Sequence, residues 1–166
     1  VADLESFDLA QLTNLLSGND AVVWSAGAGG GDAARTWAVD RDAAIRSIDA
    51  ARAAGVSRYV MVSYFGAGPD HGVPEDNSFY AYAEAKAEAD AHLRESGLDW
   101  TIVAPSGLTL DEPTGRITVG GSGEASVARG DVAAVVAAVL AEPATIGRTI
   151  EFTGGDTPIV AALAQA

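Results

Sequence analysis

The sequence predicts an α/β fold with a doubly wound parallel sheet. Short runs of apolar, β-forming residues alternate along the chain with longer segments of helical periodicity. The strand segments are continuously apolar, which is typical of parallel strands covered by helices on both faces. Right-handed crossovers between such strands then produce a doubly wound sheet. The length of 166 residues predicts one domain over 1–166.

The first elements alternate between helix and strand. Asp8 is a good N-cap for a leucine-rich helix. The apolar run 21–26 predicts a buried strand, and the glycine-rich stretch 27–31 predicts a loop. Asp32 can then cap a second helix, which Gly55 ends.

The middle of the chain contains two further strands around a long helix. Residues 58–64 predict a buried strand, and a long loop with two prolines separates it from a helix over about 78–96. The run 99–105 predicts the third strand, which ends at a proline. Residues 106–128 are irregular, with room for a small hairpin.

The last elements repeat the alternation. An apolar helix begins near residue 130 and ends before Pro143. Residues 149–154 predict a fourth strand, and Asp156 is expected to cap a short terminal helix.

Composition excludes several classes of function. The net charge of −13 opposes binding to nucleic acid, which requires positive charge against phosphates. No apolar run approaches the roughly 18 residues of a membrane span, and no signal peptide is visible, so we expect a cytoplasmic protein without a membrane partner. The chain has no cysteine, and His71 and His92 lack ligand spacing. We therefore expect no metal site and place both histidines at the surface.

The carboxyl ends of the strands are the expected location of a ligand site, because ligands of doubly wound sheets bind there. The segments that follow the four strands are Ser25–Gly27, Ser63–Gly66, Pro105–Leu108 and Thr153–Gly155.

Tyr82 and Lys86 are the candidate catalytic pair. They lie one helical turn apart, so both side chains share a face, and Lys86 is the only lysine beside nine arginines. An ammonium next to a tyrosine favours the phenolate and makes the phenol a better acid–base group near neutral pH. The alternative is an amphipathic helix in which the tyrosine packs and the lysine pairs with Glu84 or Asp90.

The stretch GAGGGD at 27–32 has some features of a dinucleotide fingerprint, because it follows a strand and opens a helix. Asp32 occupies a position where that fingerprint needs a small residue, and its carboxylate would face the pyrophosphate. We interpret the stretch as a loop after a later strand, whose backbone lies near a ligand. No nucleophile elbow surrounds Ser25 or Ser63, which weakens a hydrolase hypothesis.

Four stretches resemble the atypical short-chain dehydrogenase/reductases of the NAD(P)H-binding, NmrA-like type, which include flavin and biliverdin reductase-like proteins. They are ARAAGVSRYVMVSYFGA, YAEAKAEADAHLRESGLDWTIVAPSGLT, ARGDVAAVVAAVL and IEFTGGDTP. The resemblance implies a Rossmann-like sheet whose N-terminal strands and glycine-rich turn are missing from this chain. It also implies that Tyr82 donates a proton, that Lys86 binds the nicotinamide ribose and that Ser63 assists them.

The same resemblance implies contacts with NADP or NAD, with NADP slightly favoured. The residues concerned follow successive strands: Asp3 and Leu4; Ser25, Ala26 and Gly27; Ser63; and Pro105, Ser106, Gly107 and Leu108. The chain departs from the family where a second serine is usual, since Ser63 is followed by Tyr64 and Phe65.

These residues predict hydride transfer to a small-molecule substrate of the carbonyl, quinone or flavin type. A non-catalytic NAD(P) sensor is the alternative, and a fragment without activity of its own stays open. In the implied strand order, the strand at 21–26 lacks its neighbour, so we expect an N-terminal segment or a second chain to cover that edge.

Overall fold

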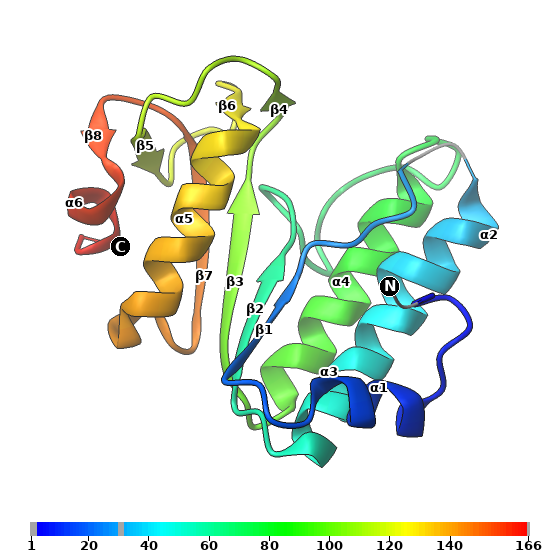
Figure 1. Cartoon of the computed structure of the whole chain (residues 1–166). Coiled ribbons are helices and arrows are strands. Elements are labelled where there is room, and N and C mark those ends of the chain that lie inside the picture. Colours follow the sequence, from blue (N-terminus) through cyan, green and yellow to red (C-terminus); the bar gives the residue numbers. More distant parts are fainter. Residues whose placement is uncertain (1–2, 30–31, 166) are drawn as a thin grey trace. The chain divides into compact units, whose positions relative to one another are not determined.

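The computed structural model describes residues 3–29 and 32–165 as alternating strands and helices (Figure 1). The strands are β1 (Ala21–Trp24), β2 (Arg58–Val62), β3 (Asp99–Pro105), β4 (Leu108–Thr109), β5 (Arg116–Val119), β6 (Val127–Ala128), β7 (Arg148–Gly154) and β8 (Thr157–Pro158). The helices are α1 (Leu9–Leu16), α2 (Ala33–Thr36), the π-helix η1 (Trp37–Ala43), α3 (Ala44–Ala54), α4 (Tyr80–Glu95), α5 (Arg129–Ala141), the 3₁₀ turn η2 (Pro143–Thr145) and α6 (Ile159–Leu163).

The main sheet has the order β1-β2-β3-β7-β5-β8, and β4 and β6 form a second, two-stranded sheet. β3 and β7 pair in parallel, whereas β5 runs antiparallel to both β7 and β8. The predicted α/β fold is therefore confirmed as a mostly parallel sheet. The segment 106–128, where a small hairpin had room, contributes the antiparallel β5 to this sheet and forms the parallel pair of β4 and β6.

The described residues divide into two compact units. Unit 1 contains residues 1–59 and 67–100, and unit 2 contains residues 60–66 and 101–166. β2 and β3 contribute residues to both. Each unit is described by itself below.

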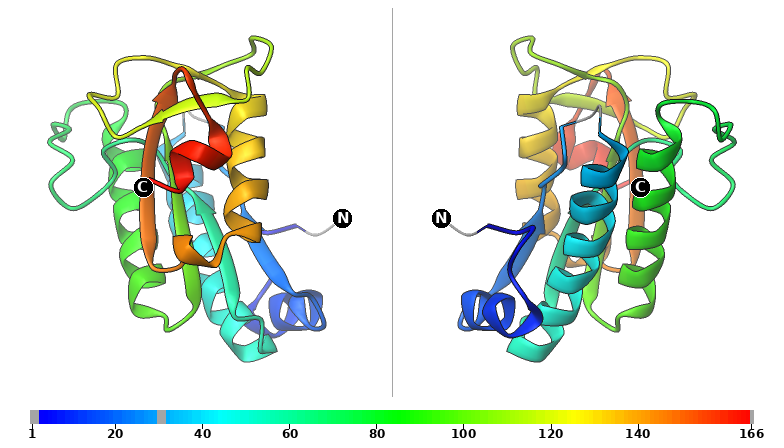
Figure 2. Two further views of the ribbon diagram at one scale, coloured as in Figure 1. Left: turned by 90° about the vertical axis from the view of Figure 1, so that its left-hand side faces the viewer. Right: turned by 90° about the vertical axis from the view of Figure 1, so that its right-hand side faces the viewer.

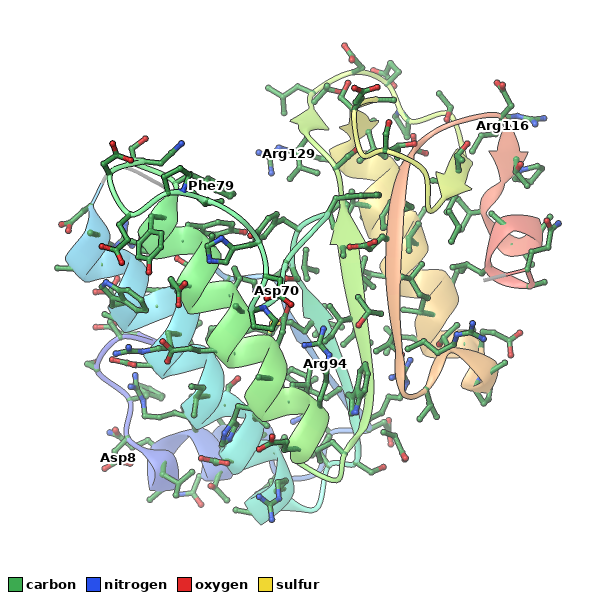
Figure 3. All side chains as sticks on the ribbon, turned by 180° about the vertical axis from the view of Figure 1, so that it is seen from behind. Asp8, Asp70, Phe79, Arg94, Arg116 and Arg129 are labelled. Atoms are coloured by element: carbon green, nitrogen blue, oxygen red, sulfur yellow. The ribbon has the colours of Figure 1, made fainter. Side chains whose placement is uncertain are left out.

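Unit 1 consists mainly of helices, and its ends follow local sequence rules. Asp8, which Figure 3 labels, caps α1 as the sequence predicts, and it forms a capping box with Gln11. Asp32 caps α2, and α2, η1 and α3 continue as one helical segment to Gly55, which adopts the left-handed conformation with φ of 76°. α1 packs along α3, and both views in Figure 2 show the two helices side by side.

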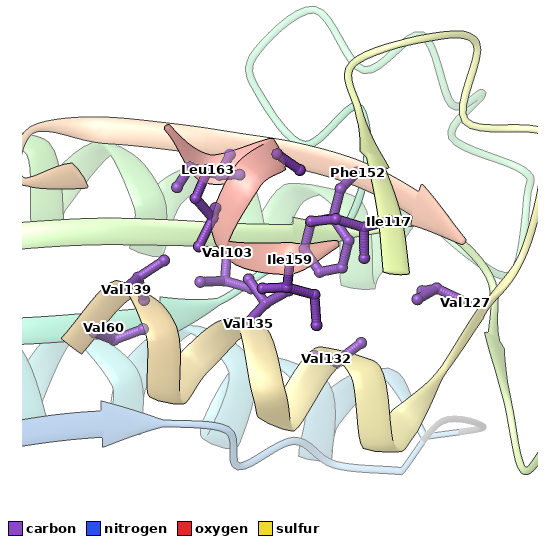
Figure 4. Packing of buried hydrophobic residues seen from close by; sticks show 12 residues of the cluster. Val60, Val103, Ile117, Val127, Val132, Val135, Val139, Phe152, Ile159 and Leu163 are labelled. Carbon is purple, nitrogen blue, oxygen red and sulfur yellow. The ribbon is translucent and has the colours of Figure 1, made fainter. Parts of the chain in front are cut away.

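Unit 2 has an aliphatic core between strands and helices. Val103 and Phe152, from neighbouring strands, pack with Val135 and Val139 of α5 and with Leu163 of α6 (Figure 4). These are branched or aromatic residues that suit a sheet–helix interface. Beside this apolar cluster, the same unit also buries the carboxylate of Asp131 on α5.

The terminal helix begins later than predicted. Pro158, not Asp156, is the N-cap of α6, so the predicted capping role of Asp156 is wrong. The chain first forms β8, which pairs with β5, and the carbonyl of Asp156 accepts a hydrogen bond from the guanidinium of Arg116 at 2.5 Å. Pairing with a strand that is distant in the sequence outweighs the local capping signal.

Candidate functional site

Tyr82 and Lys86 both lie on α4 in unit 1, as predicted. The side chain of Tyr82 is partly exposed. Its ring packs against Phe79 at the start of the helix, with 5.2 Å between ring centroids, and Figure 3 labels Phe79. The candidate proton donor therefore has an apolar neighbour on one side.

Lys86 lies inside the protein, with only 1% of its surface exposed. Burial lowers the pKa of its ammonium, while the negative charges of Asp90 and Asp40 oppose that change. Asp90 and Asp40 are themselves buried, at 0% and 2% exposed. The predicted alternative, in which Lys86 interacts with Asp90, is thus part of the structure, but in the interior rather than on a surface face.

Asp40 joins the candidate site, although no sequence pattern indicates it. It lies on η1, which packs against α4. A π-helix widens the helical turn, and such segments are frequent at functional sites. No spacing signal in the sequence predicts this π-helix. Burial raises the pKa of Asp40, and a hydrogen bond from Ala28 and the charges of Lys86 and Arg35 act in the opposite direction.

The loop after β1 is held by Asp40. The backbone N–H of Ala28 donates to Oδ2 of Asp40 at 3.1 Å. A Cβ atom on Gly27 would lie 3.0 Å from Oδ1 of the same carboxylate, so glycine lets the backbone approach this closely. Ser25 and Gly27 remain exposed. Their cofactor contacts, like that of Ala26, stay predictions.

Asp3 and Leu4 lie in a turn that two arginines support. Oδ1 of Asp3 accepts the N–H of Glu5 at 3.2 Å, and the carbonyl of Leu4 accepts from Arg46 at 3.1 Å. Arg35 connects this turn to the loop after β1, because it donates to Glu5 and to the carbonyl of Ala28, each at 2.9 Å. Within unit 1, the two segments predicted to contact the cofactor are therefore joined through one guanidinium.

The predicted strand ends of unit 2 meet one another. The N–H of Ser63 donates to the carbonyl of Val103 at 2.8 Å, and that of Phe65 donates to Pro105 at 2.9 Å. The N–H of Gly66 donates to the carboxylate of Glu151 at 2.9 Å. Ser63 is 4% exposed, and its assistance to Tyr82 and Lys86 remains a prediction.

The segment Pro105–Leu108 divides into an inner and an outer half. Ser106 is 7% exposed, and its hydroxyl donates to the carbonyl of Ala125 at 2.5 Å. Gly107 and Leu108 are exposed, and the carbonyl of Gly107 accepts the N–H of Val127 at 2.8 Å. The hydroxyl of Ser106 therefore has a structural partner, while the two residues after it face outward.

His71 is not a surface histidine, contrary to the prediction. Only 5% of its side chain is exposed, and its Nε2 lies 2.9 Å from Oε1 of Glu84 on α4. Its Nδ1 accepts the N–H of Val73 at 3.0 Å, and its ring lies edge-on to Tyr80. The loop before α4 folds back onto the helix through this imidazole, which local sequence patterns do not indicate. His92 fits the prediction better, since 36% of its side chain is exposed.

No helix in the described part of the chain is both long enough and apolar enough to cross a membrane.

This chain is similar to several known proteins. The “Uncharacterized sugar epimerase YhfK” of Bacillus subtilis is 39% identical over 148 residues, which cover 88% of this chain and 68% of the relative. Among solved structures, “Putative NAD-dependent epimerase/dehydratase from Bacillus halodurans” is 36% identical with a TM-score of 0.90, covering 100% of this chain and 77% of the other. The oxidoreductase ylbE from Lactococcus lactis is 29% identical with a TM-score of 0.89, covering 99% and 74%.

A family model described as NAD(P)H-binding matches residues 1–143, which is most of the chain. The Rossmann-like fold expected from the resemblance is borne out by the sheet and by these structures. The chain belongs to the NAD(P)H-binding family and is similar in fold to the atypical short-chain dehydrogenase/reductases.

Proposed function

We propose that this chain is the larger part of an NAD(P)H-dependent reductase that acts on a small carbonyl, quinone or flavin-type acceptor. One observation supports this most: the only lysine of the chain is buried one helical turn from a partly exposed tyrosine, and the charges of two buried carboxylates act on it. Burying three charged groups costs solvation free energy unless they interact favourably with one another or with a ligand. An acid–base site is the function that best accounts for them.

The donors in unit 1 fit a dinucleotide. The indole Nε1 of Trp24 is buried and has no hydrogen-bond partner among the described residues, immediately before the exposed Ser25. Phosphate and ribose oxygens accept hydrogen bonds, so this N–H and the ammonium of Lys86 suit such a ligand. Ser25, Ala26 and Gly27 would approach it through their backbone, and we propose NADP in preference to NAD from the family resemblance.

The proposed chemistry assigns two tasks to α4. When bound, the nicotinamide supplies a hydride to the electrophilic atom of the acceptor. Tyr82 donates its phenolic proton to the acceptor oxygen, and the positive charge of Lys86 stabilises the phenolate that this leaves. Phe79 presents an apolar surface beside Tyr82, which suits a flat, unsaturated acceptor.

The names of the similar proteins are consistent with hydride chemistry in general. One is called an oxidoreductase and two are called epimerases or an epimerase/dehydratase. Exchange of a hydride with a carbon that bears oxygen is compatible with each of these names. The acceptor class proposed for this chain rests on the family resemblance and on the apolar side of Tyr82.

A non-catalytic NAD(P) sensor is the second candidate, favoured by the sequence Ser63-Tyr64-Phe65 where the family usually has a second serine. Substituting Tyr82→Phe separates the two functions. The reductase loses at least tenfold in kcat and retains its affinity for NADPH, whereas a sensor shows no acceptor-dependent oxidation of NADPH before or after the substitution. Tyr80→Phe is the matched control, because it removes a phenol hydroxyl from the same helix and leaves Tyr82 in place.

Binding is tested by titration of the chain with NADPH and NADH. Three tryptophans, Trp24, Trp37 and Trp100, report through fluorescence, and Trp24 adjoins the proposed loop. Quenching that saturates at micromolar NADPH supports the proposal. No quenching at millimolar concentrations contradicts it for this chain and favours the third hypothesis, a segment without activity of its own.

We also propose that a neighbouring strand, from an N-terminal segment or from a second chain, covers the edge of β1. β1 is the terminal strand of the sheet order, and Val23 within it is 41% exposed. Apolar edge strands favour pairing with another chain. An intact mass that matches these 166 residues, together with a monodisperse monomer in solution, would refute both versions.

A further inference from the structure

Asp40 occupies a junction between the loop after β1 and the buried ammonium. One carboxylate oxygen accepts the N–H of Ala28, and the other lies where a Cβ on Gly27 would be 3.0 Å away. The charge of the same carboxylate acts on Lys86, and that of Lys86 acts on Asp40. A single side chain that is 2% exposed therefore contacts the loop and influences the charge on α4.

The charged groups near this junction come from three helical elements. Asp90 on α4 and Asp40 on η1 act on Lys86, and Arg35 on α2 adds a weaker positive influence on Asp40. The charges of two buried carboxylates thus act on one buried ammonium. Burial raises the pKa of Asp40 and lowers that of Lys86, and both changes favour the neutral forms.

Two carboxylates of the same elements, Asp42 and Glu88, are exposed to solvent and provide a comparison with Asp40. Asp42, also on η1, forms an ion pair with Arg41 at 2.6 Å, and its side chain is 46% exposed. Glu88 on α4 lies 3.7 Å from the same arginine. η1 therefore carries a solvated charge on one side and a buried one on the other, and only the buried one meets the loop.

We infer that Asp40 is a positioning residue that couples the placement of the loop 25–28 to the protonation of Lys86. The hydrogen bond from Ala28 stabilises the charged form of Asp40, and that charge stabilises the ammonium. If the loop moves away, Asp40 loses a donor and binds a proton more readily, and Lys86 then holds its own proton less tightly. Any ligand that displaces this loop would thus change the charge beside Tyr82. The consequence for catalysis rests on the proposed function; the coupling itself does not.

The single lysine makes the coupling directly measurable. Protein labelled with ¹³C- and ¹⁵N-lysine gives one side-chain lysine signal, so its titration reports Lys86 without assignment. Hydrogen exchange of the Ala28 amide reports whether the loop is attached to Asp40. Both measurements use the chain without cofactor.

Asp40→Asn and Asp40→Ala separate the effect of the Asp40 charge on Lys86 from the hydrogen bond that holds the loop. In Asp40→Asn the amide oxygen still accepts from Ala28, so exchange stays within about twofold of the wild type, while the proton affinity of Lys86 falls about tenfold. In Asp40→Ala the proton affinity falls and the Ala28 amide also exchanges about tenfold faster, which corresponds to the loss of one hydrogen bond. Asp42→Asn is the matched control, because it removes an equal charge from the same π-helix, and we expect neither readout to change.

Two outcomes overturn the inference. If the lysine signal of Asp40→Asn titrates as in Asp42→Asn, Asp40 does not act on Lys86. If the Ala28 amide of Asp40→Ala stays protected, Asp40 does not hold the loop. Should Asp40→Ala fail to fold, the same exchange measurement on Gly27→Val, which crowds the carboxylate from the loop side, tests the attachment. Failure of the chain to bind NADPH would contradict the proposed function and leave these results unaffected.

Discussion

The two units differ in how they bury charged side chains. Unit 2 packs aliphatic residues and one aromatic ring, among them Val103, Val135 and Phe152, into one apolar cluster, and its buried Asp131 accepts hydrogen bonds from Thr114 and Gly115. Unit 1 buries Lys86, Asp40 and Asp90 within its helices, at 1%, 2% and 0% exposed. Apolar burial stabilises a fold in proportion to area, whereas buried charges cost solvation that their mutual attraction must offset. The donors to Asp131 are neutral, whereas Lys86 of unit 1 is a buried cation on which two buried carboxylates act, and this difference indicates that the charges of unit 1 serve a purpose other than stability.

The largest effect is expected in the apolar core. Phe152→Ala removes a ring that is fully buried between β7 and the helices of unit 2. It should lower the free energy of unfolding by about 4 kcal/mol, measured by urea denaturation. Because no charged group belongs to this cluster, the loss should be the same at pH 5 and pH 8. A loss that varies with pH would contradict the contrast between the units.

Lys86→Met gives the corresponding test in unit 1. The substitution leaves Asp40 and Asp90 buried without their cation, and we expect a loss of about 3 kcal/mol at neutral pH. The loss should shrink as the pH falls, because burial raises the pKa of Asp40 and the substitution removes the cation that opposes this rise. The folded state then binds more protons than the unfolded state, which favours folding at lower pH. Urea denaturation over a pH series measures this.

The wild-type chain provides a second test of the buried Lys86, at alkaline pH. Since the pKa of Lys86 is lowered by burial, the unfolded state holds this proton more tightly than the folded state. Between the folded pKa and the ordinary lysine value near 10.4, the stability contribution of Lys86 should therefore rise with pH. The rise should be absent in Lys86→Met, and a stability curve with equal slope in both proteins would contradict it.

Local rules predicted the outline of both units better than their interiors. The caps at Asp8 and Gly55 and the end of α5 before Pro143 follow from propensities that act within a few residues. The cap at Asp156 failed because β8 pairs with a distant strand. Helical spacing placed Tyr82 and Lys86 on one face. It could not show that Lys86 is buried, because the partners that permit this burial come from other elements.

The same limit applies to Asp40 and His71. Each is an ordinary polar residue in the sequence, one within a helix and one in a loop. Their roles depend on Ala28 and on Glu84, which are 12 and 13 residues away along the chain. Helix periodicity carries no information about such contacts, so the candidate site could be predicted only where its residues share an element.

A pair of buried, uncharged hydroxyl groups in unit 1 provides a comparison with a smaller expected loss of stability. The hydroxyls of Ser47 and Tyr59 lie 2.5 Å apart, and Ser47 also donates to the carbonyl of Ala44 at 2.8 Å. Ser47→Ala leaves the phenol unpaired and should cost about 2 kcal/mol. Tyr59→Phe should cost less, because Ser47 keeps its carbonyl partner. Thermal unfolding of both variants checks the order, and the reverse order would show that Tyr59 has another partner.

The smallest effect concerns the contact between the loop and the charged interior. Gly27→Ala places a methyl group 3.0 Å from Oδ1 of Asp40, which is closer than van der Waals contact allows, so the loop or the carboxylate must move by a few tenths of an ångström. We expect a loss of about 1 kcal/mol in unfolding free energy and a shift of the Lys86 titration to lower pH. Gly68→Ala is the control, because a Cβ there meets open space. A stability loss without any change at Lys86 would mean that the loop packs on Asp40 without affecting its charge, and the purpose of the buried charges would then lie with α4 alone.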